Sequence, residues 1–249
     1  MNNPGIMENS WYEPYSARVN LDAEVKDWFT IGVNAYGTRG KEELGLLKTE
    51  SNDNFYTYMQ ATTPGICYQA PDGRYGGVNN SEDDPQSSSN NVLKMLNDVK
   101  GNRTTNNIVS RFYAQLRPFK GLTIEGSYTY AFSDQFLYQQ PVFHDLWNLY
   151  DNTLQIAGTG VSKVINRNNK TVRNNMDGLV RYETDIDRLN IQATVGARQE
   201  AYRNNWFEAS KENLTSSELT ELNDATANET ATAPYTNWAM RTFFGRYNL

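Results

Sequence analysis

The stretch LTIEGSYTYAF, residues 122–132, alternates apolar, aromatic or glycine positions with small polar or charged positions along its whole length. Because successive side chains of a β-strand point to opposite faces, this pattern predicts a strand with one apolar and one polar face. The apolar side carries Leu122, Ile124, Gly126, Tyr128, Tyr130 and Phe132, and the polar side carries Thr123, Glu125, Ser127 and Thr129.

Similar alternation recurs along the chain and predicts three hairpins and a final strand. The first hairpin covers residues 15–35 with a turn at Lys26-Asp27, and the second covers 107–132 with a turn at 118–121. The third covers 176–197 with a turn at 185–187, and a seventh strand covers 238–249. Short connections between alternating segments are typical of antiparallel hairpins.

Three long segments rich in turn-forming residues separate these hairpins. They cover about residues 37–105, 133–172 and 202–236, with a short helix expected near 217–222. Compact domains seldom contain structureless loops beyond about 12–15 residues, and globular strands average about 5–6 residues against about 10–12 expected here. All three loops would leave the same end of the sheet, as in outer-membrane barrels.

We therefore predict an all-β fold over residues 1–249: part of the wall of an antiparallel transmembrane β-barrel. The wall should be an open, curved sheet of about seven strands, with short turns at one end and long loops at the other. Soluble antiparallel sheets also alternate apolar and polar faces, so a soluble β-sandwich stays open as an alternative.

The composition favours a barrel wall over an ordinary soluble domain. Hydrophobic residues make up 38% and aromatics 12%, with 16 Tyr, and the mean hydropathy is −0.72. The net charge of −6 comes without a basic run, which argues against nucleic-acid binding. Cys67 and His144 are each the sole residue of their type, so we expect neither an internal disulfide nor a metal cluster. Aromatics near strand ends would form girdles at the membrane interfaces: Tyr128, Tyr130 and Phe132 at the loop end, and Trp28, Phe29 and Phe119 at or beside the turns.

The closing run, residues 238–248, contains Phe243-Phe244-Gly245-Arg246 and resembles a signature of SusC/RagA-type TonB-dependent receptors of Bacteroidetes. Three weaker matches occur earlier in the chain, in the same order as in the family. They are Arg18-Val19-Asn20-Leu21 with Asp27-Trp28-Phe29, then Tyr68 to Tyr75 with its Pro71-Asp72-Gly73, and then Leu189-Asn190-Ile191 with Thr194-Val195-Gly196. Together these segments span nearly the whole chain.

The resemblance implies an outer-membrane importer of glycans or peptides that draws energy from TonB. Such a receptor has about 22 strands around a plug, so we expect the signal peptide, plug and remaining strands to lie outside this chain, which could not transport by itself. The implied partners are outer-membrane lipid, the TonB complex acting through that plug, and a SusD-like lipoprotein. The residues implied to line the lumen are Arg18, Asn20, Asp22, Glu24, Glu125, Asn190, Gln192 and Arg198.

Loop aromatics are the candidate ligand-binding residues. Trp147 and Tyr150 lie in the run from Phe143 to Tyr150 beside Asn and Asp, and Trp206 lies in the third predicted loop. Aromatic rings beside such polar groups can stack on sugar faces, although a small loop core is the plainer interpretation. We find no catalytic constellation and expect neither an enzyme nor a cofactor. The alternatives are a passive porin-like channel, or a soluble sandwich that binds or hydrolyses carbohydrate.

Overall fold

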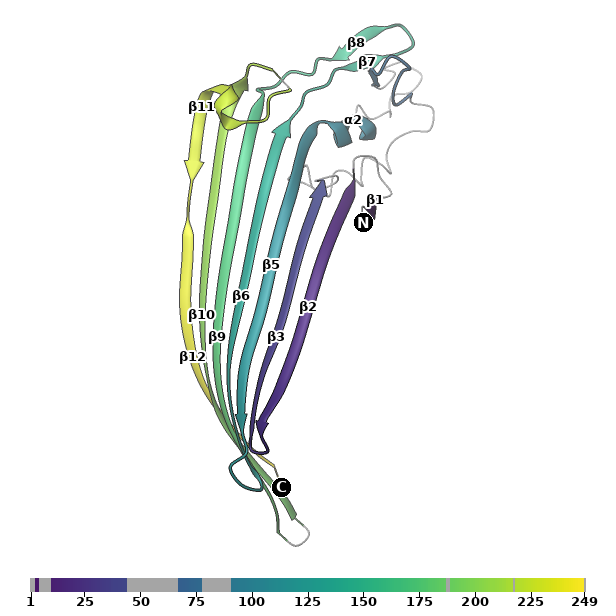
Figure 1. Cartoon of the computed structure of the whole chain (residues 1–249). Helices are drawn as coiled ribbons and strands as arrows, with labels where there is room; N and C mark the ends of the chain where they lie inside the picture. The colour runs from purple at the N-terminus through teal and green to yellow at the C-terminus, as the bar shows by residue number, and fades with distance from the viewer. Residues whose placement is uncertain are drawn as a thin grey trace.

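The computed structural model describes residues 3–4, 10–43, 67–77, 91–186, 189–216 and 218–248. Its main element is an antiparallel sheet of long strands that forms a tall, curved wall (Figure 1). Within the described residues, β2 at one side of the sheet and β12 at the other do not pair, so the wall is open. Its seven long strands are β2 (Trp11–Lys26), β3 (Phe29–Glu43), β5 (Val99–Leu116), β6 (Leu122–Pro141), β9 (Lys163–Ile186), β10 (Leu189–Leu214) and β12 (Tyr235–Asn248).

The strand order follows the chain. Hydrogen bonding runs β1-β2-β3-β5-β6-β9-β10, where β1 is the short piece Asn3–Pro4. The upper part of β10 pairs with β11 (Ala225–Thr232) and its lower part with β12. Neighbouring strands are thus joined by hairpins or by loops at one end, which is the predicted topology of a barrel wall.

The strands are longer than the sequence pattern predicted. The prediction ended each strand where apolar alternation ended, but β6 continues beyond Phe132 to Pro141 and β10 continues to Leu214. The shortest long strand has 14 residues and the longest has 26. Backbone ladders need no alternating apolar face, so the strands continue beyond the segments where the alternation ends. Parts of the predicted loops at 37–105, 133–172 and 202–236 are therefore strand.

Short turns close the other end of the sheet. Asp27 and Trp28 connect β2 to β3, one residue later than the predicted turn at Lys26-Asp27, and residues 117–121 connect β5 to β6, where 118–121 was predicted. Gly121 has a φ of 89°, and a Cβ there would lie 2.2 Å from the carbonyl oxygen of Glu183. β9 extends to Ile186, beyond Asp185 where the third turn was predicted to begin, and residues 187–188 lie outside the described part.

The loop end carries the small elements, which gather at one rim (Figure 1). A three-stranded sheet joins segments from two predicted loops, and the predicted helix at 217–222 is instead a single 3-10 turn at 222–224. Most of the polar tract at 79–91 lies outside the described residues. The rim elements are α2 (Val92–Asn97), β4 (Tyr75–Gly76), β7 (Leu146–Asn148), β8 (Thr153–Ile156), η2 (Leu222–Asp224) and β11.

Buried apolar residues lie near the rim and not behind the wall. Val164, Leu214 and Ala225 form a small core, whereas Leu21 and Phe243 on the wall are 64% and 75% exposed. A soluble sandwich would cover one face of this sheet with a second sheet, and among the described residues nothing does so. The described part of the chain also contains no helix with the length and hydropathy needed to span a membrane.

Candidate functional site: the two faces of the wall

The register of the strands sorts the side chains into two faces, because directly paired residues of antiparallel strands point the same way. One row runs across six interfaces through Asp22, Gly32, Tyr113, Ser127, Asp177, Arg198 and Thr242. The next row runs through Leu21, Val33, Phe112, Tyr128, Met176, Gln199 and Arg241. We call the face of Asp22 the polar face and the face of Leu21 the apolar face.

All eight residues that the resemblance assigned to the lumen share the polar face. Arg18 and Asn20 alternate with Asp22 on β2, and Glu125 is linked through Gln115 and Thr30 to Glu24. The remaining members, Asn190, Gln192 and Arg198, alternate along β10. The structure therefore brings them onto one surface, although they come from three strands and not from one cluster.

Cross-strand ion pairs tie this polar face together. An Arg111 nitrogen lies 2.7 Å from Glu125 Oε1, Arg198 Nε lies 2.5 Å from Asp177 Oδ1, and Arg173 Nε lies 3.2 Å from Glu200 Oε1. The Tyr113 hydroxyl donates to Asp22. The sequence did not reveal these partners, since the residues are distant in the chain and only the register places them side by side.

A hollow of about 400 Å³ opens on this face, lined by both ends of the first two ion pairs, by Asn175 and by Phe244. The side-chain oxygen of Asn175 is buried and accepts no hydrogen bond. Charged and amide groups at an open hollow suit contact with water or with a polar protein surface, and not with lipid.

The apolar face forms a band. On β6 it extends from Leu122 to Phe132, ten residue steps or about 33 Å along the strand. At a tilt of about 40°, this corresponds to about 25 Å along a membrane normal, the height of the lipid-facing band in outer-membrane barrels. Arg241 is the charged exception in the Leu21 row, and one of its nitrogens donates to Gln199 Oε1 at 2.8 Å.

Of the three aromatics predicted at the loop-side border, Tyr130 and Phe132 lie at the loop-side end of the band, whereas Tyr128 lies in its middle. Tyr15 and Tyr235, in the row just above Phe132, are 58% and 64% exposed. At the turn side, Trp28 and Phe119 are exposed beside the turns, as predicted.

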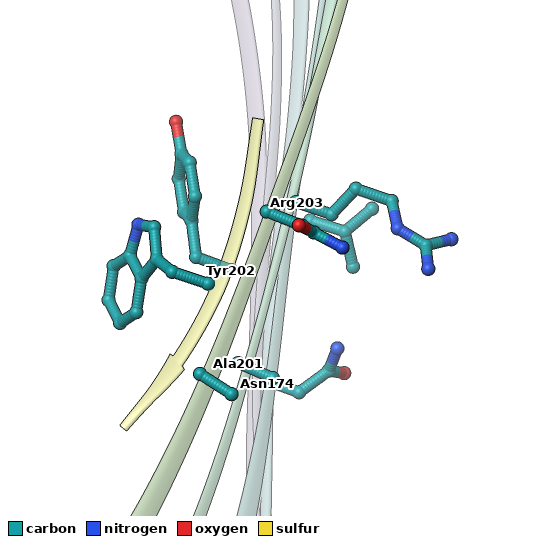
Figure 2. Close-up of a pocket in the computed structure, with 8 residues that line it drawn as sticks. Asn174, Ala201, Tyr202 and Arg203 are labelled. Carbon is teal, nitrogen blue, oxygen red and sulfur yellow. The ribbon is translucent and has the colours of Figure 1, made fainter. Parts of the chain in front are cut away.

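Near the β12 side, an aromatic stack occupies the polar face. Tyr202 and Trp238 are paired across β10 and β12, with ring centroids 5.3 Å apart, and the Arg173 guanidinium lies 5.6 Å from the Tyr202 ring. Figure 2 shows that the side chains of Tyr202 and Arg203 leave β10 on opposite sides. Arg203 therefore lies on the opposite face of the sheet from the Tyr202–Trp238 stack and from Arg173.

The predicted ligand-binding aromatics do not form one site. Trp147 lies in β7 at the rim, Tyr150 is 74% exposed in the following turn, and Trp206 lies on the polar face of β10. The prediction that Trp206 belongs to a loop is wrong, because β10 continues to Leu214. The Arg167 guanidinium lies 5.5 Å from the Trp206 ring, so this aromatic is part of the wall.

Asp72 and Asn152 hold Arg74 against Trp147, and we call this group the rim clamp. The Arg74 guanidinium lies 5.0 Å from the Trp147 ring, and Arg74 Nε donates to Asp72 Oδ2 at 2.7 Å. Arg74 also donates to Asn152 Oδ1 at 3.2 Å. The backbone N–H of Arg74, together with its guanidinium, holds the pKa of Asp72 below its usual value. These contacts hold the Arg74 guanidinium against the Trp147 ring at the rim.

The described residues contain no group of three or more His, Cys, Asp or Glu side chains that could hold a metal ion. His144 instead pairs with a carboxylate: its Nδ1 lies 3.1 Å from Asp98 Oδ1, and its ring packs edge-on against Tyr75. Within the described part of the chain, the candidate site is therefore the wall itself and its rim.

Comparison with known proteins supports the fold. No protein-family model matches the sequence, and no curated protein matches it. Among solved structures, the RagAB peptide importer in its open-open state superposes with a TM-score of 0.71 at 15% identity, over 96% of this chain and 26% of that chain. Another RagAB peptide transporter structure gives 0.67 at 15% identity, and the closed-closed state gives 0.66 at 14%, each with the same two coverages.

This likeness confirms the predicted fold, an open portion of an antiparallel β-barrel wall. The chain spans about a quarter of the length of these solved chains. At such low identity, the likeness establishes the fold alone, and activity, substrate and partners are matters for proposal.

Proposed function

We propose that this chain forms part of the barrel wall of an outer-membrane active transporter for peptides or glycans. The observation that carries the proposal is the division of one open sheet into an apolar band about 25 Å high and an ion-paired polar face, with every long loop at one rim. The likeness to a peptide importer favours peptides over glycans as the substrate class.

The polar face would contact a plug, and TonB would act on that plug from the turn side. The charges of Arg111, Glu125, Asp177 and Arg198 suit such a contact, since a folded polar surface can exchange hydrogen bonds with them. The rim, with Trp147 and its arginine clamp, would meet substrate and a SusD-like lipoprotein. All of these partners are inferences from the fold and its faces.

The first test is membrane placement. The full chain, as the cell produces it, should float with phosphatidylcholine vesicles in a density gradient and resist extraction by alkaline carbonate. A chain that stays in the aqueous fraction as a folded monomer would support the soluble sandwich instead.

The second test concerns energised import. Cells that carry the chain with its natural neighbours should take up labelled peptides, and uptake should cease when the proton gradient is collapsed. Uptake that persists without the gradient would favour the passive porin. Co-purification of a lipoprotein with the chain would identify the rim partner, and its loss on deletion of residues 146–156 would place the contact.

A further inference from the structure

The apolar face carries exposed cations at its loop-side border, and among the residues that the structure describes they lack the carboxylate partners that Arg111, Arg173 and Arg198 have on the polar face. Lys170 lies in the row of Tyr15 and Asp134, one row above the top of the apolar band. Arg203 lies on the next strand in the top row of the band, beside Val172. Because Lys170 pairs with Asn205 and Arg203 with Val172, the two cations form a diagonal pair on one face.

Neither cation has a protein counter-ion within the described residues. The polar-face arginines Arg111, Arg173 and Arg198 each pair with a carboxylate. The carboxylate directly opposite Lys170 is Asp134, and it accepts a hydrogen bond from Asn168 Nδ2 at 2.9 Å. Lys170 and Arg203 are therefore exposed, unpaired cations at the edge of the apolar band, and both can bind an anion that lies outside the protein.

The surface below them suits an acyl chain. A hollow of about 450 Å³ lies at this part of the sheet (Figure 2). Six of its eight lining residues belong to the apolar face, and Tyr202 and Trp238 of the polar face complete it: Val172, Asn174, Ala201, Arg203, Asn237 and Ala239 are the six. Ala201 and Ala239 are paired across β10 and β12, so the centre of the hollow has no large side chain. A shallow groove under two cations matches a lipid with an anionic headgroup and a chain lying along the wall.

We infer that Lys170 and Arg203 bind the phosphate group of an anionic lipid in the leaflet at the loop end of the wall. The inference rests on the proposed membrane placement and adds a specific lipid site to it. Long cationic side chains at this height reach the headgroup layer while their stems stay on apolar surface. A phosphate monoester, which can accept several charge-assisted hydrogen bonds, satisfies both cations together.

The test uses the full chain reconstituted in phosphatidylcholine vesicles with and without diphosphoryl lipid A as a minor component. Native mass spectrometry after gentle detergent extraction counts the lipid A molecules retained per protein. The parent chain should retain lipid A in preference to phosphatidylcholine. The double variant Lys170→Gln/Arg203→Gln should retain roughly tenfold less, since each basic residue near an anionic surface contributes to lipid affinity.

Two matched variants isolate the cause. Arg181→Gln/Arg246→Gln removes the same charge from the polar face, and it should retain lipid A as the parent does. The exchange Lys170→Arg/Arg203→Lys keeps both charges and should also retain lipid A, even if the neutral double variant folds poorly. Heat-dependent gel mobility reports folding for each.

The outcomes separate the two proposals. Equal retention of lipid A by the parent and the neutral double variant would overturn the lipid site, and so would loss in the polar-face control. Displacement of lipid A by millimolar inorganic phosphate would mean a free-anion site, which also overturns the inference. A parent chain that never enters vesicles would instead refute the membrane placement itself.

Discussion

The ring of Tyr113 lies directly over Gly32, its partner on the neighbouring strand, so that a Cβ at position 32 would be 2.4 Å from the ring carbons. The same Cβ would lie 2.5 Å from Asp22 Oδ1, the acceptor of the Tyr113 hydroxyl. Because Gly32 has no side chain, the Tyr113 ring can lie over β3 and reach the Asp22 carboxylate on β2, on the same face of the sheet. Phe244 covers Gly196 in a similar way on the same face.

Gly32→Ala should destabilise the wall. The added methyl group must push the Tyr113 ring aside and break its hydrogen bond to Asp22, and overpacking of this kind costs roughly 1–3 kcal/mol. The free energy of unfolding in urea, measured on the chain folded in vesicles, checks the value.

Gly126→Ala is the matched control. Gly126 is also a mid-strand glycine, but it lies on the apolar face and a Cβ there meets no atom within 4 Å. Its substitution should be neutral, or stabilising by up to about 1 kcal/mol through the unfolded chain. Equal losses in the two variants would show that Tyr113 does not need the space at Gly32.

Much of this fold could be predicted from alternation alone. The stretch 122–132 fixes one strand and both of its faces, and the register confirms that Leu122 and Phe132 share the apolar side. The turns after Lys26 and after Leu116 were also predictable, because breaks in alternation coincide there with turn-forming residues.

The strand extensions and the pairings could not be predicted. Beyond Phe132 come the polar residues 133–135 and then Phe136, Leu137 and Tyr138 in a row, so the apolar alternation is lost and no period of two marks a strand. The ladder to β5 and β9 keeps this stretch extended. For the same reason Trp206 was assigned to a loop. The ion pair of Arg198 with Asp177 depends on register, which a single strand does not encode.

A lysine should lower the folding stability far more on the apolar face of β6 than on its polar face. Tyr128 lies in the middle of the apolar band, whereas its neighbour Ser127 lies on the polar face opposite Asp177. Tyr128→Lys should cost about 2–4 kcal/mol of folding free energy in vesicles, the cost of a lysine at the bilayer midplane. Ser127→Lys should cost less than about 1 kcal/mol, because its ammonium group can approach Asp177.

Urea unfolding in vesicles measures both variants, and unfolding in detergent provides a second solvent. If the two lysines cost the same in the bilayer, the apolar face does not meet lipid. A cost for Ser127→Lys alone would reverse the assignment of the faces.

The rim clamp should release in acid. Because the backbone N–H and the guanidinium of Arg74 lower the pKa of Asp72, the clamp is fully formed above the usual Asp value of about 3.9. It is lost as the pH falls through the lowered pKa, when the protonated carboxyl no longer holds the guanidinium beside Trp147. The difference in fluorescence between the parent and Trp147→Phe should therefore change with a midpoint below pH 3.9.

Asp72→Asn removes the titrating group while keeping an acceptor of similar shape. Its difference signal should resemble that of the acid form at every pH and show no transition. A midpoint at or above the usual Asp value in the parent would contradict the clamp, because it would mean that Arg74 does not favour the carboxylate.

Exchanging both charges of one cross-strand pair should preserve the stability of the wall, whereas changing either charge alone should lower it. Asp177 and Arg198 are direct partners in the register, so Asp177→Arg or Arg198→Asp alone places like charges side by side. Each single variant should lose roughly 1 kcal/mol of unfolding free energy, and the double variant should recover most of that loss. Asp177→Arg combined with Arg246→Asp is the control, because Arg246 is paired with Thr194, two rows away, and should give no recovery. Recovery in the control, or none in the direct swap, would mean that net charge and not the register governs the polar face.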